Sequence, residues 1–185
     1  MLRPACHPLA RAQRLLIGQL ELPAPGQIEV VLGRLSSAGD GLCVPSNGKQ
    51  LRNHIWLDAA PRGGHAAVRR AAAHQYAHAV AHAAGLDPSW GEALANWTAL
   101  TVERSLDDRT LATLAGKLAA SGAGLVGDEI DWTGGNALWL AFLHESYGPT
   151  AVKLAVEELG RAEATEAALD RALRRGTGDT LEVAL

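Results

Sequence analysis

Residues 65–97 read HAAVRRAAAHQYAHAVAHAAGLDPSWGEALANW. Alanine-rich runs on both sides of residues 85–88 favour helix, and the glycine and proline between them indicate that one helix ends and a second begins. His74 and His78 are four residues apart, so on a helix their side chains point the same way. The second helix can return Glu92 to face this pair. We therefore expect a helical hairpin at the centre of the fold.

The chain before residue 64 and the chain after it have different predicted secondary structure. The predicted helices span 65–84, 89–104, 108–120, 134–147, 149–159 and 162–175, with a short tail near 178–184. Before residue 64, short runs that read as β-strands alternate with Pro- and Gly-containing turns and predict strands at 28–32, 41–44 and 53–58. Periodicity leaves residues 11–20 open between a helix and a further strand.

These patterns predict one α+β domain over residues 1–185. A β-rich part, residues 1–63, carries a small mixed β-sheet, and a mostly helical part, residues 64–185, carries the candidate site. The length of 185 residues suits one such domain and is short for two. Hydrophobic residues make up 48% of the chain and charged residues 20%, which is typical of a folded globular protein.

Charge and hydropathy exclude two classes of partner. The formal net charge of −3 argues against nucleic-acid binding, which requires a concentrated excess of Lys and Arg. No apolar run approaches the roughly 20 residues that a membrane span needs, and no signal peptide is visible, so the compartment stays open. Cys6 and Cys43 match no metal or redox spacing; we expect two free thiols, with a Cys6–Cys43 bridge as the alternative.

The pair of histidines makes the hairpin a candidate metal-binding site. Two imidazoles at this spacing can hold one Zn²⁺ ion, which needs a third protein ligand and an open fourth position if it is to act catalytically. Two His on one helix and Glu92 on the next make such a set. Three alternatives remain: solvated histidines on a polar helix face, a His78/His82 pair, and a capping box in which Glu92 serves Ser89 instead of a metal.

The two motifs HQYAH (74–78) and WGEALANW (90–97) resemble those of the gluzincin metallopeptidases, a zincin group, in its peptidase-MA-like branch. That family carries His-Glu-x-x-His on one helix and Trp-x-x-Glu-Gly-x-Ala-x-aromatic on the next. The residues that match are His74, His78, Glu92, Ala95 and Trp97, together with the tryptophan before the glutamate, Trp90. The chain reads Gly91-Glu92-Ala93 where the family has Glu-Gly, a departure that a helix can tolerate. A weaker match, an apolar helix ending in Tyr-Gly at 147–148, extends the resemblance over roughly residues 50–175. The resemblance implies a zincin-like fold, a zinc ion, and a peptide or protein as substrate or ligand.

The chain departs from this family at the residue that does the proton transfer. Where the family has the glutamate that takes a proton from the zinc-bound water, this sequence has Gln75. A carboxamide can hold a water but cannot be protonated near neutral pH, so Gln75 cannot act as a general base. Asn96, four residues after Glu92, stands where thermolysin-like relatives carry an aspartate that orients a ligand histidine.

Three further residues are weaker candidates. Tyr147 and His144 can polarise a substrate carbonyl or stabilise an oxyanion, although a packing role for Tyr147 and a solvated position for His144 are the simpler interpretations. Trp56 lies in the strand that we expect to run alongside the histidine helix, where zincins bind extended peptide.

The sequence therefore predicts a zinc-binding, metallopeptidase-like domain that is catalytically impaired, a pseudopeptidase, because Gln75 replaces the general base. One alternative is a metal-free helical interaction domain that has kept the fold and lost the site. Another is an active zinc metallopeptidase captured with an inactivating Glu-to-Gln change at position 75. The sequence does not identify the substrate or the oligomeric state.

Overall fold

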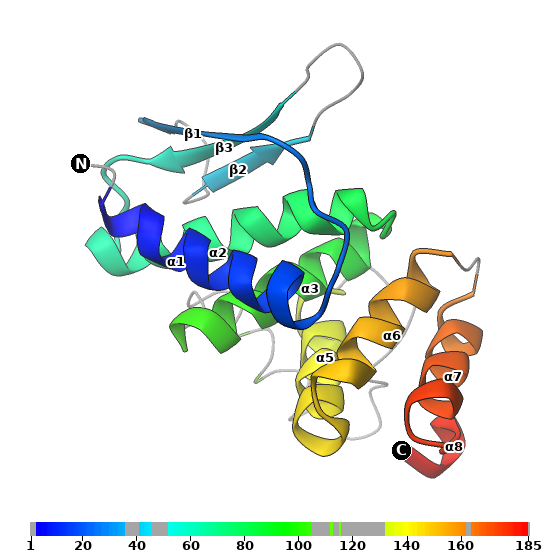
Figure 1. Cartoon of the computed structure of the whole chain (residues 1–185). Coiled ribbons are helices and arrows are strands. Elements are labelled where there is room, and N and C mark those ends of the chain that lie inside the picture. Colours follow the sequence, from blue (N-terminus) through cyan, green and yellow to red (C-terminus); the bar gives the residue numbers. More distant parts are fainter. Residues whose placement is uncertain are drawn as a thin grey trace.

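A three-stranded sheet covers one side of two helices, and the remaining helices pack below them (Figure 1). The computed structural model describes residues 3–35, 41–45, 52–104, 112, 115, 132–161 and 164–184. The two helices under the sheet are α1 (Arg3–Gln13) and α2 (Gly64–Ala83). Helix α3 (Pro88–Glu103) lies against the other side of α2. The predicted α+β class, with a small N-terminal mixed sheet followed by a mostly helical part, is confirmed.

The sheet consists of β1 (Ile28–Gly33), β2 (Gly41–Val44) and β3 (Asn53–Asp58), within one residue of the predicted bounds. Its order is β1-β3-β2. Strand β3 pairs in parallel with β1 and antiparallel with β2, which makes the sheet mixed. The last strand in sequence is therefore central, and β2 is an edge strand in the described part of the chain.

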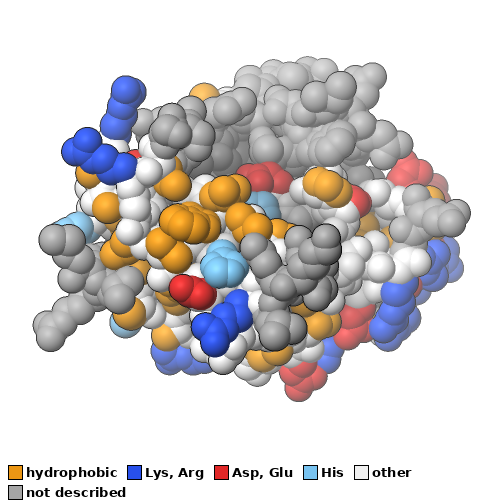
Figure 2. All heavy atoms as spheres, turned by 90° about the horizontal axis from the view of Figure 1, so that it is seen from above, with side chains coloured by type: hydrophobic (Ala, Val, Ile, Leu, Met, Phe, Trp, Pro, Cys, Tyr) orange, Lys and Arg blue, Asp and Glu red, His pale blue; other side chains and the backbone are white. Residues whose placement is uncertain are grey.

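The two faces of the sheet differ in burial because side chains alternate along a strand. On β3, Ile55 and Leu57 are fully buried against the helices, whereas Trp56 points to the opposite face and is 37% exposed. Val31 and Leu42 are the register partners of Trp56 on the two neighbouring strands. Viewed from above, hydrophobic side chains gather on this outer side of the molecule (Figure 2).

Helix α2 is buried on several sides because it lies between the sheet, α1 and α3. Its buried residues are mostly alanines, whose small side chains let neighbouring helices approach closely. Beyond α3 come α5 (Trp132–Tyr147), α6 (Pro149–Leu159), α7 (Thr165–Gly176) and the short α8 (Leu181–Ala184). The predicted helix over 108–120 lies almost wholly outside the described residues, of which it contains 112 and 115.

The expectation of a β-rich part over residues 1–63 is wrong for its first third. Residues 3–19 form α1 and a following π-helical turn, Arg14–Gln19, which also settles the open assignment of residues 11–20 as helical. Buried residues recur at helical spacing, at Ala5, Ala12 and Leu16, so the segment has an apolar stripe that faces the core. Burial of this stripe outweighs the backbone hydrogen bond that Pro8 removes inside the helix.

Buried carboxylates tie the helices to one another. The Glu103 side chain, 5% exposed, lies 2.6 Å from Arg69 and 3.6 Å from Arg11, which joins the end of α3 to α2 and α1. Glu158 of α6 accepts hydrogen bonds from Arg171 and Arg175 of α7. The Glu103 ion pairs thus support the packing that places α2 and α3 side by side, and the Glu158 ion pairs hold α6 against α7.

Two smaller expectations are also answered by the structure. Cys6 and Cys43 are both free thiols, so the alternative of a bridge between them is wrong. Among the described helices, none combines the length and the apolar character that crossing a membrane requires.

Candidate functional site

The turn between α2 and α3 brings the two predicted motifs together. Gly85 has φ of +74°, a left-handed conformation that suits glycine and ends α2. Asp87 then caps α3: its carboxylate accepts hydrogen bonds from the backbone N–H groups of Ser89 at 2.8 Å and Trp90 at 3.1 Å. Pro88 occupies the first helical position, where its missing N–H costs nothing.

This cap contradicts the capping-box alternative for Glu92. That alternative needs Ser89 as the cap, with Glu92 three residues later. Because Asp87 is the cap, Glu92 lies five residues into the helix, beyond reach of that role, and its side chain points away from the helix start toward α2. The Asp-Pro pair is a helix-start signal that sequence reasoning missed.

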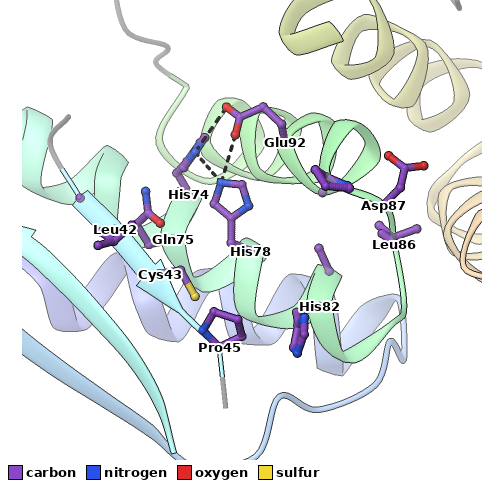
Figure 3. Close-up of a pocket in the computed structure, with 14 residues that line it drawn as sticks. Leu42, Cys43, Pro45, His74, Gln75, His78, His82, Leu86, Asp87 and Glu92 are labelled. Atoms are coloured by element: carbon purple, nitrogen blue, oxygen red, sulfur yellow. Dashed lines mark hydrogen bonds and ion pairs between the residues drawn. The ribbon is translucent and has the colours of Figure 1, made fainter. Parts of the chain in front are cut away.

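His74, His78 and Glu92 converge on one point (Figure 3). The two Nε2 atoms of the histidines are 3.0 Å apart. Glu92 Oε1 lies 3.6 Å from His74 Nε2, and Glu92 Oε2 lies 3.1 Å from His78 Nε2. Among the described residues this is the group of three possible ligands whose donor atoms all lie within 4.8 Å of one another.

These separations fit the donor set of a zinc ion. Donors bound about 2.0–2.1 Å from one tetrahedral zinc lie about 3.4 Å from one another. The three contacts of 3.0, 3.1 and 3.6 Å depart from this spacing by small fractions of an ångström, within the reach of side-chain adjustment. Two imidazoles and a carboxylate are also ligand types that zinc prefers. The residues present can therefore hold such an ion.

The surroundings of Glu92 keep its carboxylate ionised. Burial alone raises its pKa, but the hydrogen bond with His78, the charges of both histidines and a hydrogen bond from Asn96 together lower the pKa to about 2. The buried Asn96 amide donates to Glu92 Oε1 at 3.2 Å. Asn96 thus positions the Glu92 carboxylate, whereas an ionised aspartate in place of Asn96 would repel it.

Gln75, next to the first histidine, is held tightly under the sheet. Its side chain is buried and lines the same cleft as the cluster. A Cβ on Gly41 of β2 would lie only 2.9 Å from Gln75 Cγ, so glycine at position 41 makes room for this side chain. The amide of Gln75 can hydrogen-bond a water but cannot accept a proton from it near neutral pH.

A cleft of about 490 Å³ opens beside the cluster. Its lining comes from β2 and the residue after it, from α2, from the turn, and from α3: Gly41, Leu42, Cys43, Pro45, His74, Gln75, His78, Ala81, His82, Leu86, Asp87, Pro88, Gly91 and Glu92. The Trp56 strand, β3, packs against α2 as expected, but the strand that lines the cleft is β2. Trp56 sits on central β3 and faces outward, because side chains alternate along the strand and its neighbours Ile55 and Leu57 face the helices.

The remaining histidine of the cleft does not join the cluster. His82 lines the cleft one helical turn beyond His78, and its ring is directed away from the three ligand candidates (Figure 3). The alternative His78/His82 pair therefore has no third ligand among the described residues, whereas the His74/His78 pair has Glu92.

Tyr147 and His144 lie elsewhere in the structure. Neither is among the described residues that line the cleft. Burial, together with the charge of Asp179 and a hydrogen bond to it, raises the pKa of Tyr147. The His144 ring packs edge-on against Trp97, with ring centroids 5.6 Å apart. The position of Tyr147 agrees with the simpler packing interpretation, whereas His144 is half-buried against Trp97 and not the solvated residue that we expected.

Sequence reasoning missed the contribution of β2 to the cleft. Cys43 lines it, and burial raises the pKa of its thiol to about 11, so the thiol is neutral at ordinary pH. No motif in a four-residue strand indicates such a role. Comparisons of the chain with protein-family models, curated proteins and solved structures found no match.

Proposed function

We propose that this chain is a zinc-binding, peptidase-like domain in which the hydrolytic step is impaired. One observation carries the proposal: two histidines of α2 and a glutamate of α3 direct their donor atoms to one point beside an open cleft. His74, His78 and Glu92 keep 19–30% of their side-chain surface exposed, which leaves space for an open coordination position.

Each residue of the site has a separate proposed role in binding the metal or a water. A bound zinc ion supplies a Lewis acid that polarises a water and a carbonyl oxygen. His74, His78 and Glu92 would hold the ion, and the Asn96 amide would fix the Glu92 carboxylate in place by its hydrogen bond. Gln75 would orient a water through its amide.

The impairment follows from the chemistry of Gln75. Peptide hydrolysis requires a group that takes a proton from the attacking water and delivers it to the leaving amine. An amide does neither, and loss of a general base lowers rates by a factor on the order of 10² to 10⁴. The domain would therefore bind peptides far better than it cleaves them.

The position of β2 supports a peptide as the ligand. Gly41–Val44 is an edge strand in the described sheet, and residues of β2 line the cleft beside the cluster. An extended peptide can add to such an edge through main-chain hydrogen bonds.

The first test is the metal content of the purified protein, measured by elemental analysis. We expect about one zinc per chain for the wild type and loss of zinc in His74→Ala. His82→Ala is the matched control, since it removes a histidine from the same helix and cleft and should keep the metal. Absence of zinc from the wild type after loading would overturn the proposal.

The second test concerns Gln75. With zinc bound, Gln75→Glu restores the missing general base, and we expect it to raise cleavage of a quenched fluorescent peptide library by at least about 100-fold. Gln75→Asn, which keeps an amide, serves as the control and should give no gain. Zinc binding without any gain in Gln75→Glu would refute the idea that the site lacks only its base.

A metal-free interaction domain is the second candidate function. It is favoured by the close contacts that His78 Nε2 makes without any ion, at 3.0 Å to His74 Nε2 and at 3.1 Å to Glu92 Oε2. A folded chain that binds peptide with no zinc present and no effect of His74→Ala would support this candidate instead.

A further inference from the structure

Strand β1 has one unpaired side in the described part of the chain. It lies at one border of the sheet, with β3 on its other side (Figure 1). The backbone carbonyls of Gln27 and Gly33 accept hydrogen bonds from backbone N–H groups at the start of β3 and just beyond its end. Because backbone groups alternate in direction along a strand, the N–H and C=O groups of Ile28, Val30 and Leu32 point away from β3, toward the open side.

This border of β1 has none of the features that protect strand edges from pairing with another chain. Residues 28–33 read IEVVLG, without proline or lysine, and the charged residue among them, Glu29, lies on the outer face of the sheet and not toward the helices. Strand β2, at the other border, is shorter, with four residues against six. The β1 border is therefore a template for a further strand.

The apolar side chains of β1 that face the helices are only partly covered. Ile28, Val30 and Leu32 pack against the core but remain partly exposed, whereas Ile55 and Leu57 of β3 are 0% exposed. Helix α2 packs against β2 and β3, farther from this border. A strand added beside β1 would cover these side chains and satisfy the outward backbone groups at the same time.

A second copy of β1 matches this border when it runs antiparallel. With a two-fold axis beside Val30, that residue lies opposite Val30 of the copy, and Ile28 lies opposite Leu32 of the copy. These are the residues whose backbone groups point outward, so they form the hydrogen-bonded pairs of the ladder, and each pair is apolar. On the outer face, Glu29 lies opposite Val31 of the copy and not opposite a second Glu29.

We propose that this chain forms a two-fold dimer in which the β1 strands of two copies pair antiparallel about Val30 and join both sheets into one. The partner is a second copy because β1 is complementary to itself, in its apolar pairs and in the placement of its charge. A six-residue strand offers less area than the roughly 800 Å² per partner of a standard interface, so the dimer is weak. The cleft and β2 lie at the other border, so the dimer is independent of the proposed function.

The test is the molar mass of the full chain, measured by sedimentation equilibrium from about 1 to about 300 µM, the range in which a weak interface is formed and lost. We expect the mass to rise from monomer toward dimer over this range. Val30→Pro removes an outward N–H at the centre of the pairing and leaves the hydrogen bonds from β1 to β3 in place. It should abolish the dimer, while circular dichroism checks that the variant is folded.

Two substitutions at one outer position test the register. Val31→Glu places like charges opposite each other on both sides of the axis, because position 31 faces Glu29 of the copy, whereas Val31→Lys places opposite charges there. We expect the dimer of the Glu variant to be about tenfold or more weaker than that of the Lys variant. Leu42→Glu is the matched control, since Leu42 flanks Trp56 from β2 as Val31 does from β1, and it should leave the dimer intact.

A monomer mass over the whole concentration range would overturn the inference. A dimer that survives Val30→Pro, or equal dimer affinities of Val31→Glu and Val31→Lys, would do the same. Loss of the dimer in Leu42→Glu alone would place the interface at the β2 border and also overturn it. His74→Ala should dimerise like the wild type, so the zinc site and the dimer can fail separately.

Discussion

If the cluster on α2 and α3 binds zinc, the metal must stabilise the folded chain by an amount that depends on each ligand. The ligand candidates come from different helices, so the unfolded chain does not hold them together and zinc binds mainly the native state. With free zinc about 100-fold above its dissociation constant, linkage adds about 2.7 kcal/mol to the free energy of unfolding. For a domain of this size the Tm rises by about 5–10 °C.

The structure predicts that different variants lose different amounts of this zinc-dependent increase in the free energy of unfolding. His78→Ala removes a direct ligand candidate and lowers the affinity by at least about 100-fold, which leaves about 0.4 kcal/mol or less at the same zinc concentration. Asn96→Ala removes only the hydrogen bond of 3.2 Å to Glu92. A loss of about tenfold in affinity for this variant leaves about 1.4 kcal/mol of the gain.

The assay is thermal unfolding with and without zinc, each variant being compared with its own metal-free Tm. His82→Ala is the control and should show the full zinc-induced shift, because His82 lies outside the cluster. A shift that disappears in His82→Ala and persists in His74→Ala would refute the assignment of the ligand pair. An equal shift in all variants would place zinc elsewhere in the chain.

Two further predictions concern the framework of the site. Glu158→Gln weakens the hydrogen bonds from the half-exposed Arg171 and Arg175 and should lower the free energy of unfolding by about 1–2 kcal/mol in urea titrations. The hydrogen bond from Arg171 holds the pKa of Glu158 below its ordinary value; Arg175 lowers it further, and burial opposes both. The stabilisation by the ionised Glu158 is therefore present at neutral pH and is lost as the pH falls below about 4. A deficit that does not shrink in acid would contradict this account. Gly41→Ala forces a contact of 2.9 Å on Gln75 Cγ and should cost about 1–3 kcal/mol, measured in the same titrations; a neutral effect would show that β2 shifts freely.

Local patterns predicted the secondary structure near the site because short-range physics governs it. The short strand-like runs between turns predicted β1, β2 and β3 to within one residue, and the histidine spacing placed His74 and His78 on one face of α2. The N-terminal helix was missed because its two prolines, Pro4 and Pro8, suggest turns, while the burial of its apolar stripe against α2 is a tertiary effect.

The sequence alone determines that His74 and His78 share one helix face, because that depends only on their spacing along α2. It also determines that position 75 carries an amide, because that is a matter of residue type. The convergence of Glu92 on that pair follows from the packing of α3 against α2 and from the Asp87 cap, which sets where α3 begins. The strand order that puts β2, and not the Trp56 strand, beside the cleft likewise depends on long-range pairing. Side chains from separate elements meet only when the whole core packs, and no local pattern encodes that geometry.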